Sequence, residues 1–142
     1  MEFVIDPKGE LSDLIRNIIE IADTDEYGME FFPGASDEEI AQFESVNNFS
    51  LSEQVKEWLR FTDGCRLFDA IIQLYGVACK PFFDTNPKGI SGGYIRIGAF
   101  NFGDAICILD KSSKIIQYGE TLIEYASFRE FLEYVIEIGV ED

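Results

Sequence analysis

Negative charge is the feature that most limits what this chain can fold into. Eleven Lys and Arg residues stand against 27 Asp and Glu, so the 142-residue chain has a formal net charge of −16. Repulsion within so acidic a chain opposes compaction, and a basic binding partner would offset that cost. Histidine, the side chain most often used for proton transfer near neutral pH, is absent. These counts favour a binding protein over an enzyme.

The chain still has enough apolar residues to build a core. Hydrophobic residues make up 46% of the sequence and aromatic residues 14%, a composition that argues against disorder. The length is typical of one domain, so we expect a single domain over residues 1–142. We expect neither a membrane span nor a secretory signal, because no apolar run is long enough and the first seven residues lack a basic segment.

The cysteines and the charge also limit the cofactors and partners. Cys65, Cys79 and Cys107 do not have the spacing of metal ligands, and there is no histidine to complete a zinc site. We interpret them as reduced thiols in a cytoplasmic protein with no cofactor and no metal. Nucleic acid and anionic membranes are disfavoured as partners, because both are bound through Lys and Arg.

Helix-start signals and apolar periodicity predict four helices. Asp6 before Pro7 is typical of an N-cap and first helical position. Ser36 with Glu39, and Ser127 with Glu130, have the spacing of capping boxes. Ser52 is a further expected cap, and Asp63-Gly64 a helix stop. The predicted helices run from Pro7 to about Ala22, from Ser36 to Asn47-Asn48, from Ser52 to Asp63, and from Ser127 through Ile136.

Between the third and fourth helices the sequence predicts strands. They are expected within residues 66–77 (one or two strands) and at 94–97, 105–109 and 114–118, with a long loop over 80–93. Strands grouped in one block and joined by short turns favour an antiparallel sheet. We therefore predict an α+β fold in which a mostly antiparallel sheet of about 4–6 strands packs with N-terminal helices and one C-terminal helix.

Several of these segments form a recognisable series of motifs. A Pro precedes an acidic helix start, a second helix ends in an Asp-Gly pair, and Ile-Gly, Gly-Asp and an apolar strand closing in Asp follow. They are Phe32 to Ile40, Leu51 to Cys65, Ile97-Gly98, Gly103-Asp104, Ile106 to Asp110, and the final helix at Phe128 to Leu132. In this order the motifs resemble the SUKH superfamily, which includes yeast cell-wall assembly regulators and many bacterial immunity proteins.

The resemblance spans about Phe32 to Ile138 and has three departures: Ser52 replaces a Pro, Val55 a Tyr and Cys65 a Gly. It implies a SUKH-like fold without catalytic apparatus. For a bacterial member it implies neutralisation of a cognate protein toxin, often a nuclease. A nuclease presents cationic surface to bind phosphates, so an acidic inhibitor would be steered to it. An intracellular regulatory scaffold that binds endogenous proteins is the alternative.

The candidate contact residues are acidic. Asp23, Asp25 and Glu26 share one loop and are our first choice. The acids at residues 37–39 have a structural explanation, because a helix N-terminus favours negative charge. Asp84 in the 80–93 loop and Asp104 in the Gly-Asp turn are further candidates. Tyr27 and Phe83 are either aromatic anchors for a partner or ordinary core residues.

Three other interpretations are disfavoured by missing residues. The segment 23–28 is not a calcium loop, because Tyr27 occupies a ligand position and Gly34 stands where a bidentate Glu is required. The glycine-rich segment 89–93 has no following Lys-Ser/Thr to hold a phosphate. An enzyme using paired carboxylates is a third hypothesis, but nothing in the sequence singles out such a pair.

Overall fold

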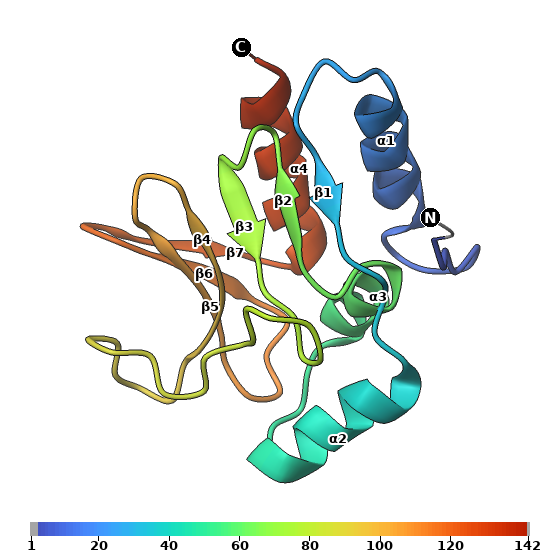
Figure 1. Cartoon of the computed structure of the whole chain (residues 1–142). Coiled ribbons are helices and arrows are strands. Elements are labelled where there is room, and N and C mark those ends of the chain that lie inside the picture. The colour runs from blue at the N-terminus through green and yellow to red at the C-terminus, as the bar shows by residue number, and fades with distance from the viewer. Residues whose placement is uncertain (1–2, 142) are drawn as a thin grey trace.

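Seven strands form one antiparallel sheet, and their order in space is their order along the chain (Figure 1). The structure is a computed structural model that describes residues 3–141. Residues 1, 2 and 142 of the expected 1–142 domain lie outside this range. The strands are β1 (Glu30–Phe31), β2 (Cys65–Leu67), β3 (Ile72–Leu74), β4 (Ile95–Phe100), β5 (Ala105–Ile108), β6 (Ile115–Tyr118) and β7 (Leu122–Tyr125).

Four helices accompany the sheet within the described range: α1 (Ser12–Asp23), α2 (Asp37–Asn47), α3 (Glu53–Phe61) and α4 (Phe128–Val140). The predicted α+β class is therefore confirmed, but the sheet has seven strands rather than about 4–6. Two strands were not predicted from the sequence. β1 has only two residues, too few to show a periodic pattern. β7 exposes both Leu122 and Ile123, so it lacks the apolar–polar alternation of a half-buried strand.

The predicted caps of α2 and α3 are confirmed. The Ser36 hydroxyl accepts a hydrogen bond from the Glu39 backbone N–H at 3.1 Å, and the Glu39 carboxylate accepts one from the Ser36 N–H at 2.9 Å. The Ser52 hydroxyl accepts from the Val55 N–H at 3.2 Å. At α4 the Ser127 cap forms, but the Glu130 carboxylate accepts from the Ala126 N–H. The second capping box is therefore only half confirmed.

The start of α1 differs from the prediction. The Asp6 carboxylate accepts from the Lys8 N–H at 2.9 Å and forms a separate turn, so the helix begins only at Ser12. The N–H of Leu11, the N-cap residue, donates instead to the Glu57 carboxylate of α3, at 3.1 and 3.2 Å. A cap supplied by a residue 46 positions away cannot be found from local sequence.

One face of the sheet packs against helices. Ile15 and Ile18 of α1, Leu59 of α3 and Phe131 and Leu132 of α4 are buried in one large core with the sheet. Residues of β5 alternate between the faces, as strand geometry requires. Ile106 and Ile108 enter this core, whereas Ala105, Cys107 and Ile116 form a smaller cluster against Ile90 and Tyr94.

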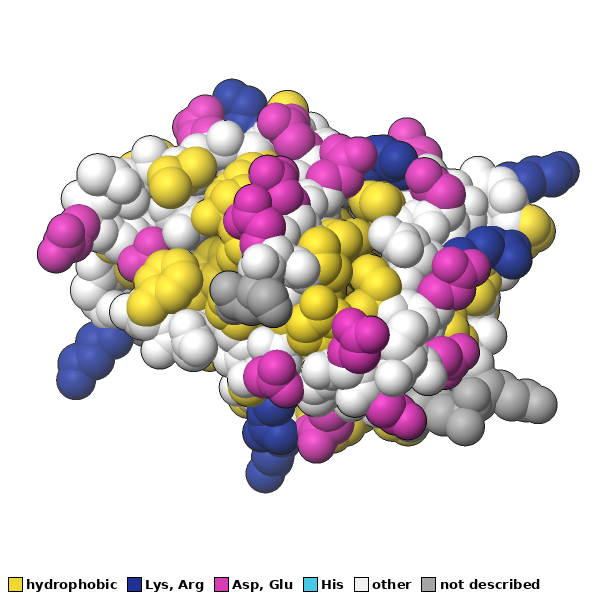
Figure 2. Space-filling model, turned by 90° about the horizontal axis from the view of Figure 1, so that it is seen from above, with side chains coloured by type: hydrophobic (Ala, Val, Ile, Leu, Met, Phe, Trp, Pro, Cys, Tyr) yellow, Lys and Arg dark blue, Asp and Glu magenta, His cyan; other side chains and the backbone are white. Residues whose placement is uncertain are grey.

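Three segments meet at one end of the molecule: the loop between α1 and β1, the turn between β2 and β3, and the C-terminal end of α4 (Figure 1). The Phe68 ring of the turn lies over Gly139 of α4, where a Cβ atom would collide with it. The same ring meets Tyr27 edge-on, with 5.4 Å between centroids. Figure 2 views the molecule from this end.

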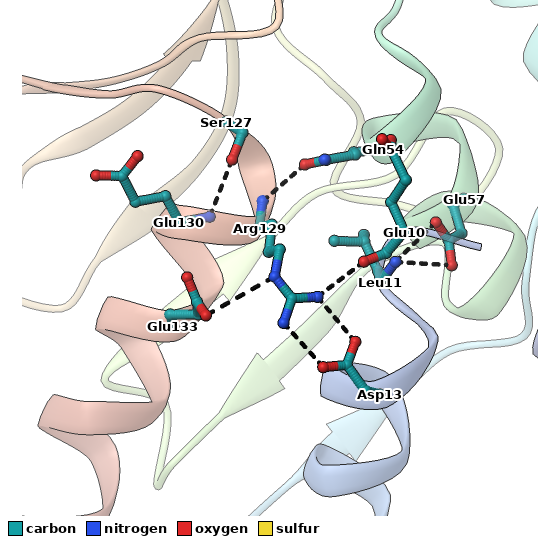
Figure 3. A network of polar contacts seen from close by, with 9 residues as sticks. All are labelled: Glu10, Leu11, Asp13, Gln54, Glu57, Ser127, Arg129, Glu130 and Glu133. Carbon is teal, nitrogen blue, oxygen red and sulfur yellow. Dashed lines mark hydrogen bonds and ion pairs between the residues drawn. The ribbon is translucent and has the colours of Figure 1, made fainter. Parts of the chain in front are cut away.

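At the opposite end of α1 a polar junction joins three helices (Figure 3). Two guanidinium nitrogens of Arg129 on α4 donate to the two carboxylate oxygens of Asp13 on α1, both at 2.8 Å. This pairing lowers the pKa of Asp13 to about 2. The Arg129 backbone N–H donates to the side-chain oxygen of Gln54 on α3 at 2.8 Å. Through Gln54 and Glu57, α3 thus supplies acceptors to the first turns of both α4 and α1.

The Glu57 cap leads to a first prediction. Burial raises the pKa of Glu57, so the stability that its protonated form contributes is lost as the pH rises through the pKa of the folded state. Glu57→Gln keeps an acceptor without the buried charge. We expect it to stay within about 1 kcal/mol of the parent and to gain on it from pH 4 to pH 7. Glu57→Ala should lose about 1–3 kcal/mol.

Urea unfolding of the three proteins at both pH values measures these differences. If Glu57→Gln is as destabilised as Glu57→Ala, the charge rather than the acceptor holds α1, and this interpretation of the cap is wrong.

Candidate functional site

The acidic loop that the sequence singles out borders a hollow of about 530 Å³. The carboxylates and the apolar side chains come from α1, the loop, β1 and the β2–β3 turn. The lining residues are Phe3, Ile19, Ala22, Asp23, Asp25, Glu26, Tyr27, Gly28, Met29, Phe31 and Asp69. The structure thus brings Asp23, Asp25 and Glu26 together at one hollow with apolar walls. It adds Asp69, which sequence analysis did not identify.

Local hydrogen bonds turn the chain sharply after α1. The Thr24 hydroxyl donates to the Ile21 carbonyl at 2.7 Å, and the Asp25 N–H donates to the Ala22 carbonyl at 3.2 Å. Asp25 has a φ of 59°, a left-handed conformation that Asp tolerates better than most residues. The turn leaves Asp25 and Glu26 exposed to solvent.

Asp69 fastens the far end of the loop. Its carboxylate accepts from the Gly28 N–H at 2.7 Å, and its own N–H donates to the Gly28 carbonyl at 2.9 Å. Phe68, Asp69 and Ala70 all have positive φ, between 53° and 64°. Each such residue costs of order 1 kcal/mol or more and persists only where its surroundings fix it. The two hydrogen bonds between Asp69 and Gly28 therefore join the loop to this turn.

The loop acids lie where the backbone disfavours negative charge. Asp23 is the last residue of α1 rather than part of the loop, and Asp25 and Glu26 follow it. All three lie at the C-terminus of the helix, which carries the negative end of the helix dipole, and the last turn of α1 contains no basic residue. By contrast, the acids at residues 37–39 lie in the first turn of α2, where the dipole stabilises them. The left-handed φ of Asp25 suits Asp and Asn alike, so the fold gives no reason for negative charge at residues 23–26.

Most other carboxylates accept hydrogen bonds or form ion pairs within the fold. Asp63, only 1% exposed, accepts from three successive backbone N–H groups, those of Val77, Ala78 and Cys79, at 2.7–2.9 Å. The other carboxylates that accept from backbone N–H groups are Asp6, Glu39, Glu44, Glu57, Asp69, Asp84, Asp110 and Glu130. Those in ion pairs are Asp13, Glu30, Asp37, Glu53, Glu124 and Glu133.

A smaller group of carboxylates has neither a hydrogen-bond partner nor an ion-pair partner among residues 3–141. It consists of Glu10, Glu20, Asp23, Asp25, Glu26, Glu38, Glu120, Glu137 and Glu141. Three of these fall within the four residues 23–26, which is the densest group. Figure 2 shows hydrophobic side chains gathered over this end of the molecule, with Asp and Glu around them and Lys and Arg toward the edges.

The other predicted contact residues lie apart from the loop. Asp84 is exposed, and its backbone forms two 2.9 Å hydrogen bonds with that of Arg96. The half-buried Asp104 carboxylate accepts from the Gln117 amide at 2.9 Å, and the Gln117 oxygen accepts from the Tyr125 hydroxyl at 2.7 Å. Asp104 is thus part of a structural hydrogen-bond chain.

The two candidate aromatic anchors differ in burial. Phe83 is buried in the core and meets Phe43 edge-on, so it is not an exposed anchor. Tyr27 is half-buried and lines the acidic hollow, where one side of the ring can contact a bound molecule.

A second hollow, of about 520 Å³, lies between α2 and residues 77–78. Its lining includes Glu38, Glu39, Phe43 and Val46. Glu39 is engaged in the capping box of α2, so only Glu38 brings an unpaired carboxylate to this hollow. The α1–β1 loop therefore remains the stronger candidate for recognising a basic surface.

The thiols are poorly suited to nucleophilic chemistry. Burial raises the pKa of Cys65 to about 12 and that of Cys107 to about 11, and it also raises the pKa of Cys79. Thiols with raised pKa values are inert near neutral pH. Within residues 3–141 no three Cys, Asp or Glu side chains converge as metal ligands. No described helix has the length and apolar character needed to cross a membrane.

The sequence also matches a known protein family. A family model described as the SMI1 / KNR4 family (SUKH-1) matches residues 34–134, which is most of the chain. The chain belongs to the SUKH-1 family. The resemblance seen in the motifs is therefore confirmed, and SUKH-1 membership is consistent with the role of an immunity protein. No match is found among curated proteins.

The SUKH-1 match and the candidate site overlap only in part. The matched residues begin after β1 and end within α4, so they include Asp69. Asp23, Asp25 and Glu26 lie before the matched segment. Sequence reasoning missed Asp69 because its partner, Gly28, lies 41 residues away, and no local pattern connects the two.

The contact between Asp69 and Gly28 can be tested directly. Asp69→Ala removes the acceptor and also strains a left-handed position, so the loop should loosen. We expect the Gly28 amide to exchange about tenfold faster with deuterium, as expected for losing about 1.4 kcal/mol of local stability. Asp69→Asn, which keeps an acceptor and tolerates positive φ, should remain close to the parent. Equal exchange in all three proteins would show that Asp69 does not hold the loop.

Proposed function

We propose that this protein is a bacterial, cytoplasmic immunity protein that binds and neutralises a cognate toxin with a basic surface. The loop formed by Asp23, Asp25 and Glu26 makes the first contact, and the adjoining hollow receives a side chain of the toxin. Neutralisation is stoichiometric: the acidic end covers the cationic surface that the toxin needs. No cofactor takes part, and neither nucleic acid nor a membrane is the partner.

The observation that carries this proposal is the cluster of unpaired carboxylates at residues 23–26. The cluster lies at the unfavourable end of a helix dipole and beside apolar walls, so it costs stability without supporting the fold. Complementary charge speeds the encounter of two proteins, and an inhibitor of a lethal enzyme gains from fast association. A nuclease is the toxin class that fits best, because it must present cationic groups to bind phosphates.

The alternative, a regulatory scaffold for endogenous proteins, shares the acidic surface but not the lethal partner. Co-expression with the neighbouring open reading frame separates the two. If the neighbour encodes a toxin, its expression should stop growth, and this protein should restore it. A harmless neighbour, or growth arrest that this protein does not relieve, would contradict the immunity proposal.

Charge reversal tests the contact surface. Asp25→Lys with Glu26→Lys should slow association with the toxin about tenfold or more at low salt and flatten its dependence on ionic strength. Stopped-flow mixing over a series of salt concentrations measures both effects. Glu10→Lys with Glu38→Lys is the matched control, because it changes the net charge equally at exposed, unpaired acids elsewhere. It should slow association much less.

The comparison between the two double variants decides the result. If both slow association equally, the net charge rather than the loop steers the partner. If neither does, the contact lies on another surface.

A further inference from the structure

The two edges of the sheet are unequal. β1 forms one edge with only two residues, one of them Glu30, which pairs with Arg66 at 2.8 Å. β7 forms the other edge with four residues, and among the described residues no further strand pairs with it on its outer side. Backbone groups of a strand point alternately to its two sides, so half of those of β7 face outward without a strand to pair with.

The side chains of β7 protect this edge weakly. Natural edge strands are commonly protected by charged side chains, Pro, a bulge or short length; β7 has four residues, Leu-Ile-Glu-Tyr, of which only Glu124 is charged. Leu122 is 52% exposed and Ile123 is 41% exposed. Ile123 shares a face with Tyr125, whose ring lies 5.6 Å from that of the partly exposed Tyr134 on α4. The edge therefore offers open backbone groups next to apolar surface.

The charge around β7 indicates what can pair with it. Glu120 precedes the strand and is unpaired among the described residues, while Glu124 on the strand is 3.6 Å from Lys114. A second copy of this chain would bring another Glu124 and another net charge of −16 to the same edge. The contact of Glu124 with Lys114 is long and its side chain is 54% exposed, so Glu124 can still meet a cation of a partner. A strand with basic side chains on one face and apolar side chains on the other would therefore complement Glu124 and Ile123.

We infer that β7 accepts an extended segment of a basic partner protein as an eighth strand of the sheet. The backbone of the segment pairs with the outer side of β7. Its apolar side chains pack beside Ile123 and Tyr134, and its basic side chains lie beside Glu124. This is strand addition, in which main-chain hydrogen bonds supply affinity and alternate side chains supply specificity. The inference rests on the proposed function, because it assumes that the toxin is the basic partner and holds it at a second place.

A synthetic peptide tests the edge without the toxin. The probe is Lys-Val-Lys-Val-Lys-Val, blocked at both ends, titrated into isotopically labelled protein and followed by NMR. We expect amide shifts concentrated in β7 and slower hydrogen exchange at alternate residues of the strand. In two further peptides, either the Lys or the Val backbone nitrogens are methylated. Because N–H groups alternate between the two sides of a strand, only one of these peptides loses the donors that face β7. That peptide should bind about tenfold or more weakly, while the other should bind about as well as the parent peptide.

Variants on the protein side control for charge. Leu122→Lys places a cation on the edge strand, where it disfavours pairing with another strand and repels the cationic peptide, so it should abolish peptide binding. Val46→Lys, at a 69% exposed position on α2, should preserve it. Equal binding of both methylated peptides, or no binding of the parent peptide, would overturn the inference. A dimer that Leu122→Lys converts to monomer would also overturn it, because the occupant would then be a second copy.

These outcomes are separate from the immunity proposal. Rescue of growth together with failure of the peptide would reject strand addition alone. Peptide binding without any toxin that this protein neutralises would reject the immunity role and leave the edge as a general site for basic strands.

Discussion

A shortage of cations is the constraint on which the rest of this structure depends. With 27 carboxylic side chains and 11 Lys and Arg, most of the negative charge cannot be balanced by ion pairs. The fold places many carboxylates against backbone N–H groups instead. Asp63 fixes residues 77–79, and Asp69 holds the α1–β1 loop. Hydrogen bonds to a charged acceptor are stronger than neutral ones, so the acids that threaten compaction also organise the backbone.

The use of acids as acceptors explains which parts of the fold could be predicted. The caps Ser36 and Ser52, the antiparallel strands and the closing helix follow from local patterns. The start of α1 does not, because its acceptor, Glu57, comes from α3. Nor do the edge strands, since β1 is too short for a periodic pattern and β7 is exposed on successive positions. Long-range contacts and exposed edges are the features that periodicity does not record.

The candidate site, too, could be predicted from the sequence only in part. The sequence places Asp23, Asp25 and Glu26 on one loop, and the structure brings them to one hollow. From the sequence these acids rank above Asp104 because three of them lie close together, but no local pattern shows that Asp104 is engaged with Gln117. The distinction required knowing which carboxylates already have a partner. Once the engaged acids are set aside, the unpaired ones concentrate at residues 23–26, which is the basis for proposing a partner there.

We propose two contacts with a basic protein, made by different physical means. The loop contributes long-range attraction and a hollow for a side chain. The open edge at β7 contributes directional backbone hydrogen bonds. Charge governs how fast the two proteins meet, whereas short-range contacts govern how long they stay together. The inhibitor that we propose would benefit from both.

The central claim is that the acids at residues 23–26 do not support the fold. Neutralising them together, as Asp23→Asn, Asp25→Asn and Glu26→Gln, tests it most directly by urea unfolding of the parent and the variant at neutral pH. We predict that the variant is within about 0.5 kcal/mol of the parent in stability, or more stable, since self-repulsion falls. Asp63→Asn, as reference, should lose about 2 kcal/mol or more. A loss of more than about 1 kcal/mol in the triple variant would contradict the account, because these acids would then be part of the structure.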